Sequence, residues 1–217
     1  MQTFFAIFQI ITLITFLVVF IGRSLFLYFR YGINPLVLGV GKGGIRRITE
    51  IGFFIGLALW IYEVAAAALH WSTRIFGGIF TSVLLDSFVA KSIGVVLVTG
   101  GFTLFISALV AFGQSWRVGI DERNPGELVT HGIFTYSRNP IFLFIDLYFI
   151  GTFLINSTLF FLLAALIVVI GIHYQILQEE RFLLQHYGDS YRVYRNAAGR
   201  YLTWKRAHTQ GHISSMG

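Results

Sequence analysis

The sequence contains no cysteine, which excludes disulfide bonds, thiolate zinc sites and cysteine nucleophiles. Charged residues are also scarce: they make up 12% of the 217 residues, about half the share found in soluble domains. Hydrophobic residues make up 56% and the mean hydropathy is +0.74. We therefore expect one integral membrane domain over residues 1–207, followed by a polar tail over residues 208–217.

Long apolar runs predict the membrane segments. Three runs contain about the 20 residues that a hydrocarbon core roughly 30 Å thick requires: residues 3–21, 51–69 and 92–112. The first lacks a basic start and a small-residue cleavage site, so we expect a retained helix. Two shorter runs, 141–155 and 157–172, are separated only by Asn156 and predict a helical hairpin whose second helix continues through Gln178. The expected fold is all-α, with about five transmembrane helices and a cytoplasmic C-terminal helical segment.

Lysine and arginine alternate between the loops of this five-helix arrangement. Basic residues stay on the cytoplasmic side of membranes, so the N-terminus should face out and the C-terminus should face the cytoplasm. Lipid headgroups explain the net charge of +6 more simply than nucleic acid does. The successive segments between and after the runs hold five (Arg23, Arg30, Lys42, Arg46, Arg47), two (Arg74, Lys91), three (Arg117, Arg123, Arg138), none, and six (Arg181, Arg192, Arg195, Arg200, Lys205, Arg206).

Polar residues mark the start of the fourth helix. Pro140 suits a first helical turn, where its missing N–H costs nothing, and Asn139 suits the N-cap before it. The free N–H groups would then face residues 126–137 and favour a carboxylate or phosphate, for which Arg138 adds a guanidinium donor. From these residues alone, a capped helix end with an arginine reaching the headgroups remains the alternative.

The end of the fifth helix carries two adjacent acidic residues. Glu179 shares a helical face with Gln175, and Glu180 shares one with His173. Carboxylates where an apolar helix leaves the membrane are poor lipid neighbours, so they indicate a site for a cationic group. The alternative is a solvated helix end that pairs with a nearby arginine such as Arg138.

Ionisable residues inside the apolar runs are also candidates. Asp146 follows the start of the fourth helix by about one and a half turns and is a candidate substrate ligand that faces the same cavity. His173 could orient the substrate or act as a base, or it could be a packing histidine. For Glu63 we expect a structural contact.

The two polar clusters together resemble a known superfamily. The string "LVTHGIFTYSRNPIF" resembles the signature "LVTxGxYxxxRHPxY" of the isoprenylcysteine carboxyl methyltransferases and phospholipid methyltransferases. The string "EERFLLQHYGDSYRVYRNAAGRYL" is similar to that superfamily's ending "EExxLxxxFGxxYxxYxxxVxR", and "GQSWRVGIDE" is similar to a segment of its bacterial members. The resemblance covers residues 111–202.

The resemblance implies a membrane enzyme that uses S-adenosylmethionine. Carried over by position, the cofactor-binding residues would be Gly126, Glu127, Leu128, Val129, Phe134, Asn139, Pro140, Phe142 and Glu179. A carboxylate and aromatic faces suit the cofactor's cationic groups, and methyl transfer needs mainly positioning and exclusion of water.

Three departures from the family pattern bear on the substrate. Asn139 replaces the common histidine, and Phe134 and Phe142 replace tyrosines. Gln175 stands where eukaryotic carboxyl methyltransferases place an arginine for the substrate carboxylate, so either another arginine replaces it or the substrate has no carboxylate there. The catalytic candidates are Arg117, Arg138, Glu180 and Arg195, and the substrate candidates are Asp146, His173 and Gln175.

The expected function is methylation of a lipid-like or prenylated small substrate at the cytoplasmic face, with no metal and no nucleic acid involved. The alternatives are a phospholipid ethanolamine N-methyltransferase and a non-catalytic membrane scaffold. The run "SWRVGID" favours a bacterial inner membrane.

Overall fold

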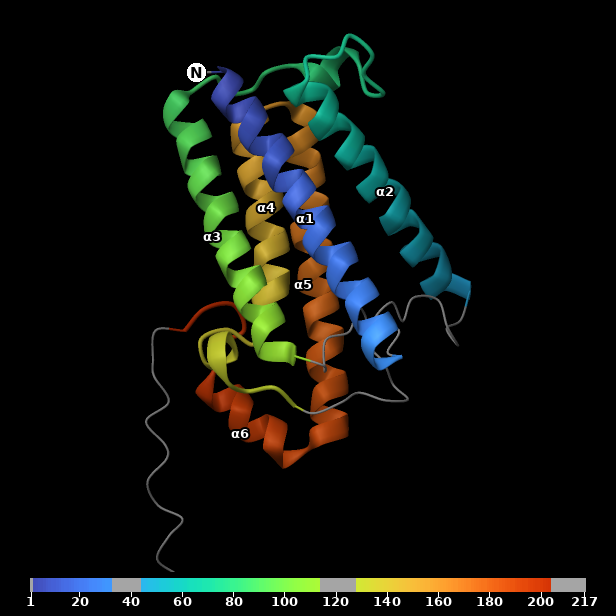
Figure 1. The fold of residues 1–217 in the computed structure, drawn as a ribbon, viewed down its shortest axis with the longest axis vertical. Coiled ribbons are helices and arrows are strands. Elements are labelled where there is room, and N and C mark those ends of the chain that lie inside the picture. Colours follow the sequence, from blue (N-terminus) through green and yellow to red (C-terminus); the bar gives the residue numbers. More distant parts are fainter. Residues whose placement is uncertain (1, 33–43, 114–127, 204–217) are drawn as a thin grey trace, which may run out of the picture.

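The computed structural model describes residues 2–32, 44–113 and 128–203. These residues form α-helices joined by loops and short 3₁₀ turns, and the part of the chain described has isolated bridges but no β-strand. Five long helices stand side by side and a short sixth crosses one end (Figure 1). They are α1 (Gln2–Tyr31), α2 (Gly44–Ala68), α3 (Phe88–Phe112), α4 (Pro140–Asn156), α5 (Leu159–Tyr187) and α6 (Asp189–Ala197).

The expected all-α membrane fold is confirmed. The three helices α1, α3 and α5 are long and apolar enough to cross a membrane, and α4 and residues 54–68 of α2 are shorter apolar helices. Exposed side chains on the bundle include Phe29, Val110 and Ile167, which are 79%, 78% and 71% exposed. Large apolar side chains on the outer surface suit a surrounding of lipid tails rather than water.

The hairpin of α4 and α5 forms where the sequence predicts it. Helix α4 begins at Pro140 and ends at Asn156, because Ser157 adopts a left-handed conformation with φ of 52°. The loop that precedes α3 closes over this turn, since the N–H of Leu84 donates to the carbonyl of Ser157 at 2.7 Å. Helix α5 then continues well past its apolar part, which ends near Ile176, so Glu179 and Glu180 lie beyond the membrane-spanning portion.

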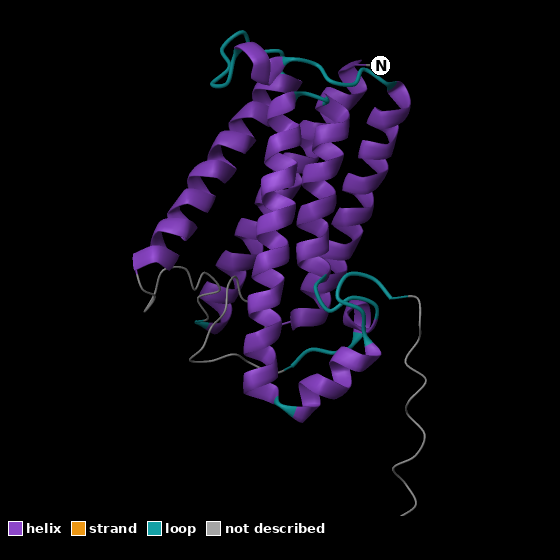
Figure 2. Cartoon of the chain, turned by 180° about the vertical axis from the view of Figure 1, so that it is seen from behind, coloured by secondary structure: helices purple, strands orange, loops and turns teal. Residues whose placement is uncertain are grey.

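The bundle has two ends that differ in character. The upper end in Figure 1 carries the N-terminus, the α2–α3 loop and the α4–α5 turn. The lower end carries the end of α3, the start of α4, the end of α5 and α6. Figure 2 shows the last turns of α5 reaching below the other helices to the turn into α6, and in both views the lower half of α2 diverges from the bundle.

The core is held by aromatic contacts and by one close backbone approach. Phe105 of α3 stacks on Phe144 of α4 with ring centroids 4.6 Å apart. Farther up the same two helices, glycines meet: a methyl group placed on Gly151 would lie 2.7 Å from the carbonyl oxygen of Gly94. Only residues without a Cβ allow the two backbones to approach so closely.

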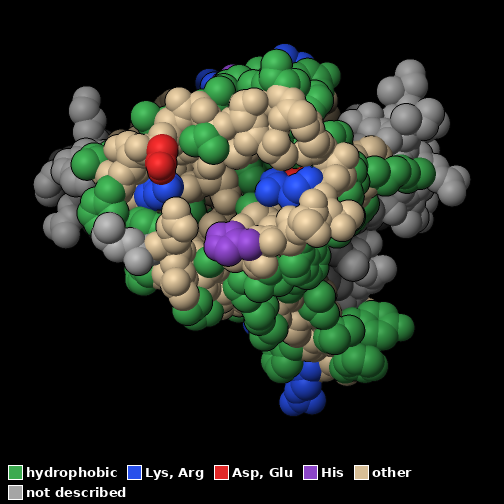
Figure 3. All heavy atoms as spheres, turned by 90° about the horizontal axis from the view of Figure 1, so that it is seen from above, with side chains coloured by type: hydrophobic (Ala, Val, Ile, Leu, Met, Phe, Trp, Pro, Cys, Tyr) green, Lys and Arg blue, Asp and Glu red, His purple; other side chains and the backbone are tan. Residues whose placement is uncertain are grey.

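The upper end holds isolated charges among hydrophobic and uncharged groups (Figure 3). Glu63 of α2 is fully buried there and accepts hydrogen bonds from Arg74 Nε at 2.6 Å and from the backbone N–H of Ile75 and Phe76 at 2.9 and 3.2 Å. The expectation that Glu63 makes a structural contact is therefore confirmed.

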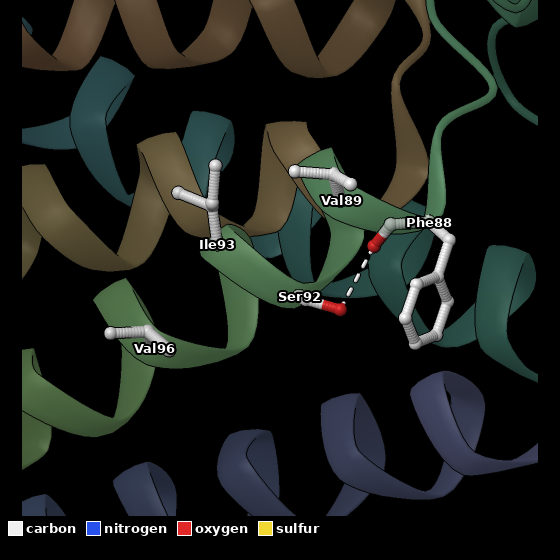
Figure 4. A pocket seen from close by; sticks show the side chains of 5 residues that line it. All are labelled: Phe88, Val89, Ser92, Ile93 and Val96. Atoms are coloured by element: carbon white, nitrogen blue, oxygen red, sulfur yellow. Dashed lines mark hydrogen bonds between the residues drawn. The ribbon is translucent and has the colours of Figure 1, made fainter.

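An apolar hollow lies on α3 near this end (Figure 4). It is lined by Phe88, Val89, Ser92, Ile93 and Val96, and Ser92 Oγ donates to the carbonyl of Phe88 at 2.9 Å. A hydroxyl bonded within its own helix leaves nothing in the groove for a polar ligand, and the wall is of the kind that lipid tails cover.

Candidate functional site

A buried carboxylate organises the lower end. Glu180 of α5 is 7% exposed and accepts hydrogen bonds from Arg138 Nη2 at 2.8 Å and from Arg200 Nη2 at 2.9 Å. Burial alone would raise the pKa of Glu180, but the hydrogen bonds and positive charge of Arg200 and Arg138 hold it below its usual value. Glu180 is therefore an ionised, fully engaged carboxylate.

Arg138 joins three segments of the chain. Besides Glu180, its Nη1 donates to the carbonyl oxygens of Arg195 and Ala198 at 2.8 and 2.7 Å. Its own backbone N–H donates to the carbonyl of Gly199 at 2.9 Å, next to the isolated bridge between Ser137 and Gly199. The start of α4, the end of α5 and the segment after α6 thus meet at one guanidinium, as the sequence predicted for the first two.

The expectation that the side chain of Asn139 caps α4 is wrong. Asn139 occupies the N-cap position and Pro140 follows it in the first turn, but its side chain makes no capping hydrogen bond. Instead, Nδ2 donates to the carbonyl of Arg200 at 3.0 Å and to Glu180 Oε1 at 3.4 Å. Because the side-chain amide of Asn139 binds the C-terminal segment, the first turn of α4 has no side-chain cap.

Glu179 differs sharply from its neighbour. It is half-buried, and no side chain or backbone group in the described ranges donates a hydrogen bond to it. Burial and then the adjacent charge of Glu180 raise the pKa of Glu179 to about 7. Phe142, in the first turns of α4, and Gln175, one turn before Glu179, are also half-buried.

The other predicted cofactor residues divide between core and surface. Phe134 is 4% exposed and packs edge-on against Phe112 with ring centroids 4.6 Å apart. Its carbonyl accepts a hydrogen bond from the hydroxyl of Tyr194 at 2.9 Å. Leu128 and Val129 pack against the same cluster, so these side chains form the base of the lower end.

Of the predicted substrate residues, His173 contacts Tyr201. His173 of α5 is exposed, and its Nδ1 lies 2.6 Å from the hydroxyl of Tyr201. Burial, followed by the negative charge of Asp146, raises the pKa of Tyr201. Asp146 is 6% exposed, and its Oδ1 has no hydrogen-bond partner within the residues the structure describes.

Some predicted site residues take no side-chain part in the contacts around Glu180 and Tyr201. Arg195 is exposed in the last turn of α6, where only its backbone carbonyl joins the site. Arg117, Gly126 and Glu127 lie outside the described residues.

Sequence reasoning gave no role to Arg200 and Arg23, which the structure singles out, and it named Tyr201 only among the aromatic residues that could cover the acidic end of α5. Arg200 binds Glu180, and it occupies the final arginine position of the ending "EExxLxxxFGxxYxxYxxxVxR", which was the available signal. Tyr201 follows it. Arg23 of α1 donates to the carbonyl of Gly113 at the end of α3, and its Nε is buried without a partner among the described residues. An arginine seven residues after the inward-facing Phe16 could have indicated this position.

Comparison with known proteins agrees with this geometry. Residues 89–190 match the family model described as phospholipid methyltransferase, and the matched segment contains α3, α4, α5 and the start of α6. No curated protein and no solved structure matches the chain. The matched segment includes both acidic residues of α5 and the uncapped start of α4, and this family includes the isoprenylcysteine carboxyl methyltransferases. Residues 89–190 of this chain therefore match a phospholipid methyltransferase domain, and the match suggests a membrane methyltransferase that acts on lipid-like substrates.

Proposed function

We propose that the protein is an integral membrane S-adenosylmethionine-dependent methyltransferase of the isoprenylcysteine carboxyl methyltransferase kind. It methylates a lipid-like or prenylated small substrate at the cytoplasmic face of the membrane. The observation that carries this proposal is that, inside the family segment, the Arg138–Glu180 pair joins the uncapped start of α4 to the end of α5, where Glu179 is the adjacent residue.

The residues at the lower end fit the cofactor. Glu179 offers a half-buried carboxylate, with no donor of its own among the described residues, to the cofactor's ammonium group. The uncapped N–H groups of α4 suit its carboxylate, and the ring of Phe142 suits the sulfonium and the adenine. When bound, S-adenosylmethionine supplies an electrophilic methyl group. Phe134, Leu128 and Val129 support this site from the core beneath it.

Arg138, Glu180, Asn139 and Arg200 act as positioning residues. Their hydrogen bonds are mutual, so they fix the distance between α4, α5 and the C-terminal segment rather than contact the reacting atoms. Fixed geometry is the main requirement for an in-line methyl transfer. Arg195, exposed at the edge of the site, and Arg117 are the arginines left to meet a substrate carboxylate.

We place the lower end in the cytoplasm. The helices alternate in direction, and the described residues Arg30, Arg138 and Arg200 lie toward the lower end, whereas Arg74 and Lys91 lie at the upper end. The positive-inside rule then puts the N-terminus outside and the C-terminus in the cytoplasm. The resemblance of the run "SWRVGID" to bacterial members of the superfamily supports a bacterial inner membrane.

Binding of S-adenosylmethionine to the purified protein in nanodiscs tests the proposal. We expect saturable binding of one cofactor per chain, together with transfer of labelled methyl groups to a lipid fraction. A protein that folds but binds no cofactor would be a non-catalytic scaffold, and the proposal would be wrong.

A second candidate function is methylation of ethanolamine phospholipids at nitrogen. The description of the matched family favours it. Expression of the protein in cells that contain phosphatidylethanolamine, followed by mass spectrometry of their lipids, distinguishes the two. Methylated ethanolamine lipids would support this second function over prenylcysteine methylation.

A further inference from the structure

Asp146 combines deep burial with the lack of a hydrogen-bond partner. It is 6% exposed, and its Oδ1 accepts no hydrogen bond from the described part of the chain. Glu63 and Glu180 are buried to a similar degree, yet arginines neutralise both. A buried carboxylate without such a partner costs several kcal/mol, so a chain that keeps one needs a use for it.

The position of Asp146 along α4 defines its surroundings. Three residues farther up the same face, Phe149 stacks on Trp60 of α2 with ring centroids 4.4 Å apart. Seven residues farther down that face, Asn139 binds the carbonyl of Arg200. Asp146 therefore lies between an aromatic layer toward the membrane centre and the polar cluster at the lower end.

A hydroxyl and an imidazole pair at the lower end of the bundle. The hydroxyl of Tyr201 is 2.6 Å from Nδ1 of His173, and His173 is exposed. The negative charge of Asp146 is among the causes that raise the pKa of Tyr201. Tyr201 and His173 are thus groups that can exchange a proton with the aqueous side.

We propose that Asp146 binds the methyl acceptor through a proton-bearing nitrogen or oxygen atom and takes up that proton during methyl transfer. This inference rests on the proposed membrane methyltransferase activity and, between its two candidate functions, favours a lipid-like amine or alcohol over the carboxylate of a prenylcysteine. A carboxylate acceptor is disfavoured, because its negative charge would lie beside that of Asp146.

The step balances without any further reactant. The acceptor's lone pair forms the bond to the methyl carbon, and the methyl–sulfur bond breaks with its electron pair passing to sulfur. The acceptor's proton passes to Asp146 Oδ1 and is then released to water. The net products are the methylated acceptor, a neutral thioether and one proton.

Three acceptors separate the chemistries in nanodiscs with labelled cofactor: dioleoylphosphatidylethanolamine for an amine, farnesol for an alcohol and N-acetyl-S-farnesylcysteine for a carboxylate. We expect label in the amine or the alcohol. Asp146→Asn should lower the transfer rate at saturating cofactor at least about 100-fold, as loss of a general base does. The dissociation constant for S-adenosylmethionine should change by less than about twofold, because Asp146 is not assigned to that site.

Thermal unfolding distinguishes this role from a structural one. Asp146→Asn should raise the unfolding temperature, because it removes a buried charge without removing a hydrogen bond. A partnered structural carboxylate would give a lower temperature instead. Asp86→Asn, at an exposed pair on the upper end, is the matched control and should change neither quantity.

The possible outcomes contradict either the role of Asp146 or the proposed function itself. Preferred methylation of the carboxylate, an undiminished rate in Asp146→Asn, or a lower unfolding temperature would each overturn the inference. So would cofactor binding without transfer to the amine or the alcohol, which leaves the proposed function standing. Wild-type protein that neither binds S-adenosylmethionine nor transfers a methyl group would contradict the proposed function, and the inference with it.

Discussion

The two ends of the bundle hold buried carboxylates in opposite ways. At the upper end, Glu63 is satisfied by Arg74 and two backbone N–H groups that follow it by 11 to 13 residues. At the lower end, Glu180 is satisfied by Arg138 and Arg200, which lie 42 and 20 residues away along the chain. The upper contact fastens one local loop, whereas the lower contact fixes three separate segments to each other.

The two ends also differ in which polar groups lack a hydrogen-bond partner. Glu63 leaves no carboxylate oxygen without a donor. The lower end keeps Glu179 and Asp146 without hydrogen-bond donors among the described residues, and the first turn of α4 without a side-chain cap. Buried polar groups without a hydrogen-bond partner lower the stability of a protein. Proteins keep such groups mainly at sites that bind ligands. At the upper end Thr158 Oγ1 also lacks a partner among the described residues, but Glu63 and Asp86 are both paired, and this contrast supports the proposal that the lower end is the binding end.

The largest change in stability at either end should come from Glu180→Ala. Removing the carboxylate leaves Arg138, whose side chain is 9% exposed, with an uncompensated charge. We expect a loss of about 3–5 kcal/mol in the free energy of unfolding, as for other broken buried pairs. The unfolding temperature in detergent measures it. Glu180→Gln keeps the shape of the side chain and should lower the free energy of unfolding by less. If Glu180→Ala were as stable as the wild type, other contacts would have to hold the three segments together.

Glu179→Ala should affect binding and spare stability. Because Glu179 has no hydrogen-bond partner among the described residues, its loss should not lower the unfolding temperature. Loss of a charged contact to the cofactor should weaken S-adenosylmethionine binding at least about tenfold, which corresponds to about 1.4 kcal/mol. Isothermal titration gives the dissociation constant. Glu63→Ala is the control that should lower stability without this loss of affinity, and equal loss of affinity in both variants would remove Glu179 from the site.

The pH dependence of cofactor binding tests the role of Glu179. Its raised pKa of about 7 means that the carboxylate is neutral below that pH and charged above it. A cationic ligand should therefore bind more tightly as the pH rises, by about eightfold between pH 6 and 7.5 if only the charged form binds. Titrations across that range measure the change. Glu179→Gln should give a flat profile, and a wild-type profile that falls with rising pH would contradict the assignment.

The smallest effect should come from Asp86→Asn at the upper end. Asp86 and Lys91 form a 2.7 Å ion pair, but the aspartate side chain is 76% exposed. Exposed pairs contribute little, so the free energy of unfolding should change by less than about 1 kcal/mol. Thermal unfolding at low and high salt measures it. A large change would mean that the upper end depends on surface charge as well as on Glu63.

Most of the fold could be predicted because membrane helices are specified locally. The apolar runs fall within α1 to α5, and Asn156 and Pro140 lie at the ends of α4 as expected, since run length and helix-end residues act over a few positions. The meeting of the start of α4 with the end of α5 was also predictable, because both polar clusters stand at the same end of a short hairpin.

The partners within the site were not predictable to the same degree. Arg200 reaches Glu180 only after the chain passes through α6, so nothing in the spacing between them selects the pair. Asn139 carries a good capping side chain, but the carbonyl of Arg200 takes its amide because the C-terminal segment lies beside the start of α4. Both outcomes depend on tertiary placement rather than on local preference. The roles of Glu179 and Asp146 in binding stay predictions.

The contact between Gly94 and Gly151 limits how the lower end can open. Because a single added methyl group would clash with backbone on either side, α3 and α4 have little freedom to slide or rotate against each other. The depth of Asp146 in the bilayer is then fixed relative to α3. Any widening of the lower end that admits a lipid therefore has to come from a helix outside this pair or from the C-terminal segment.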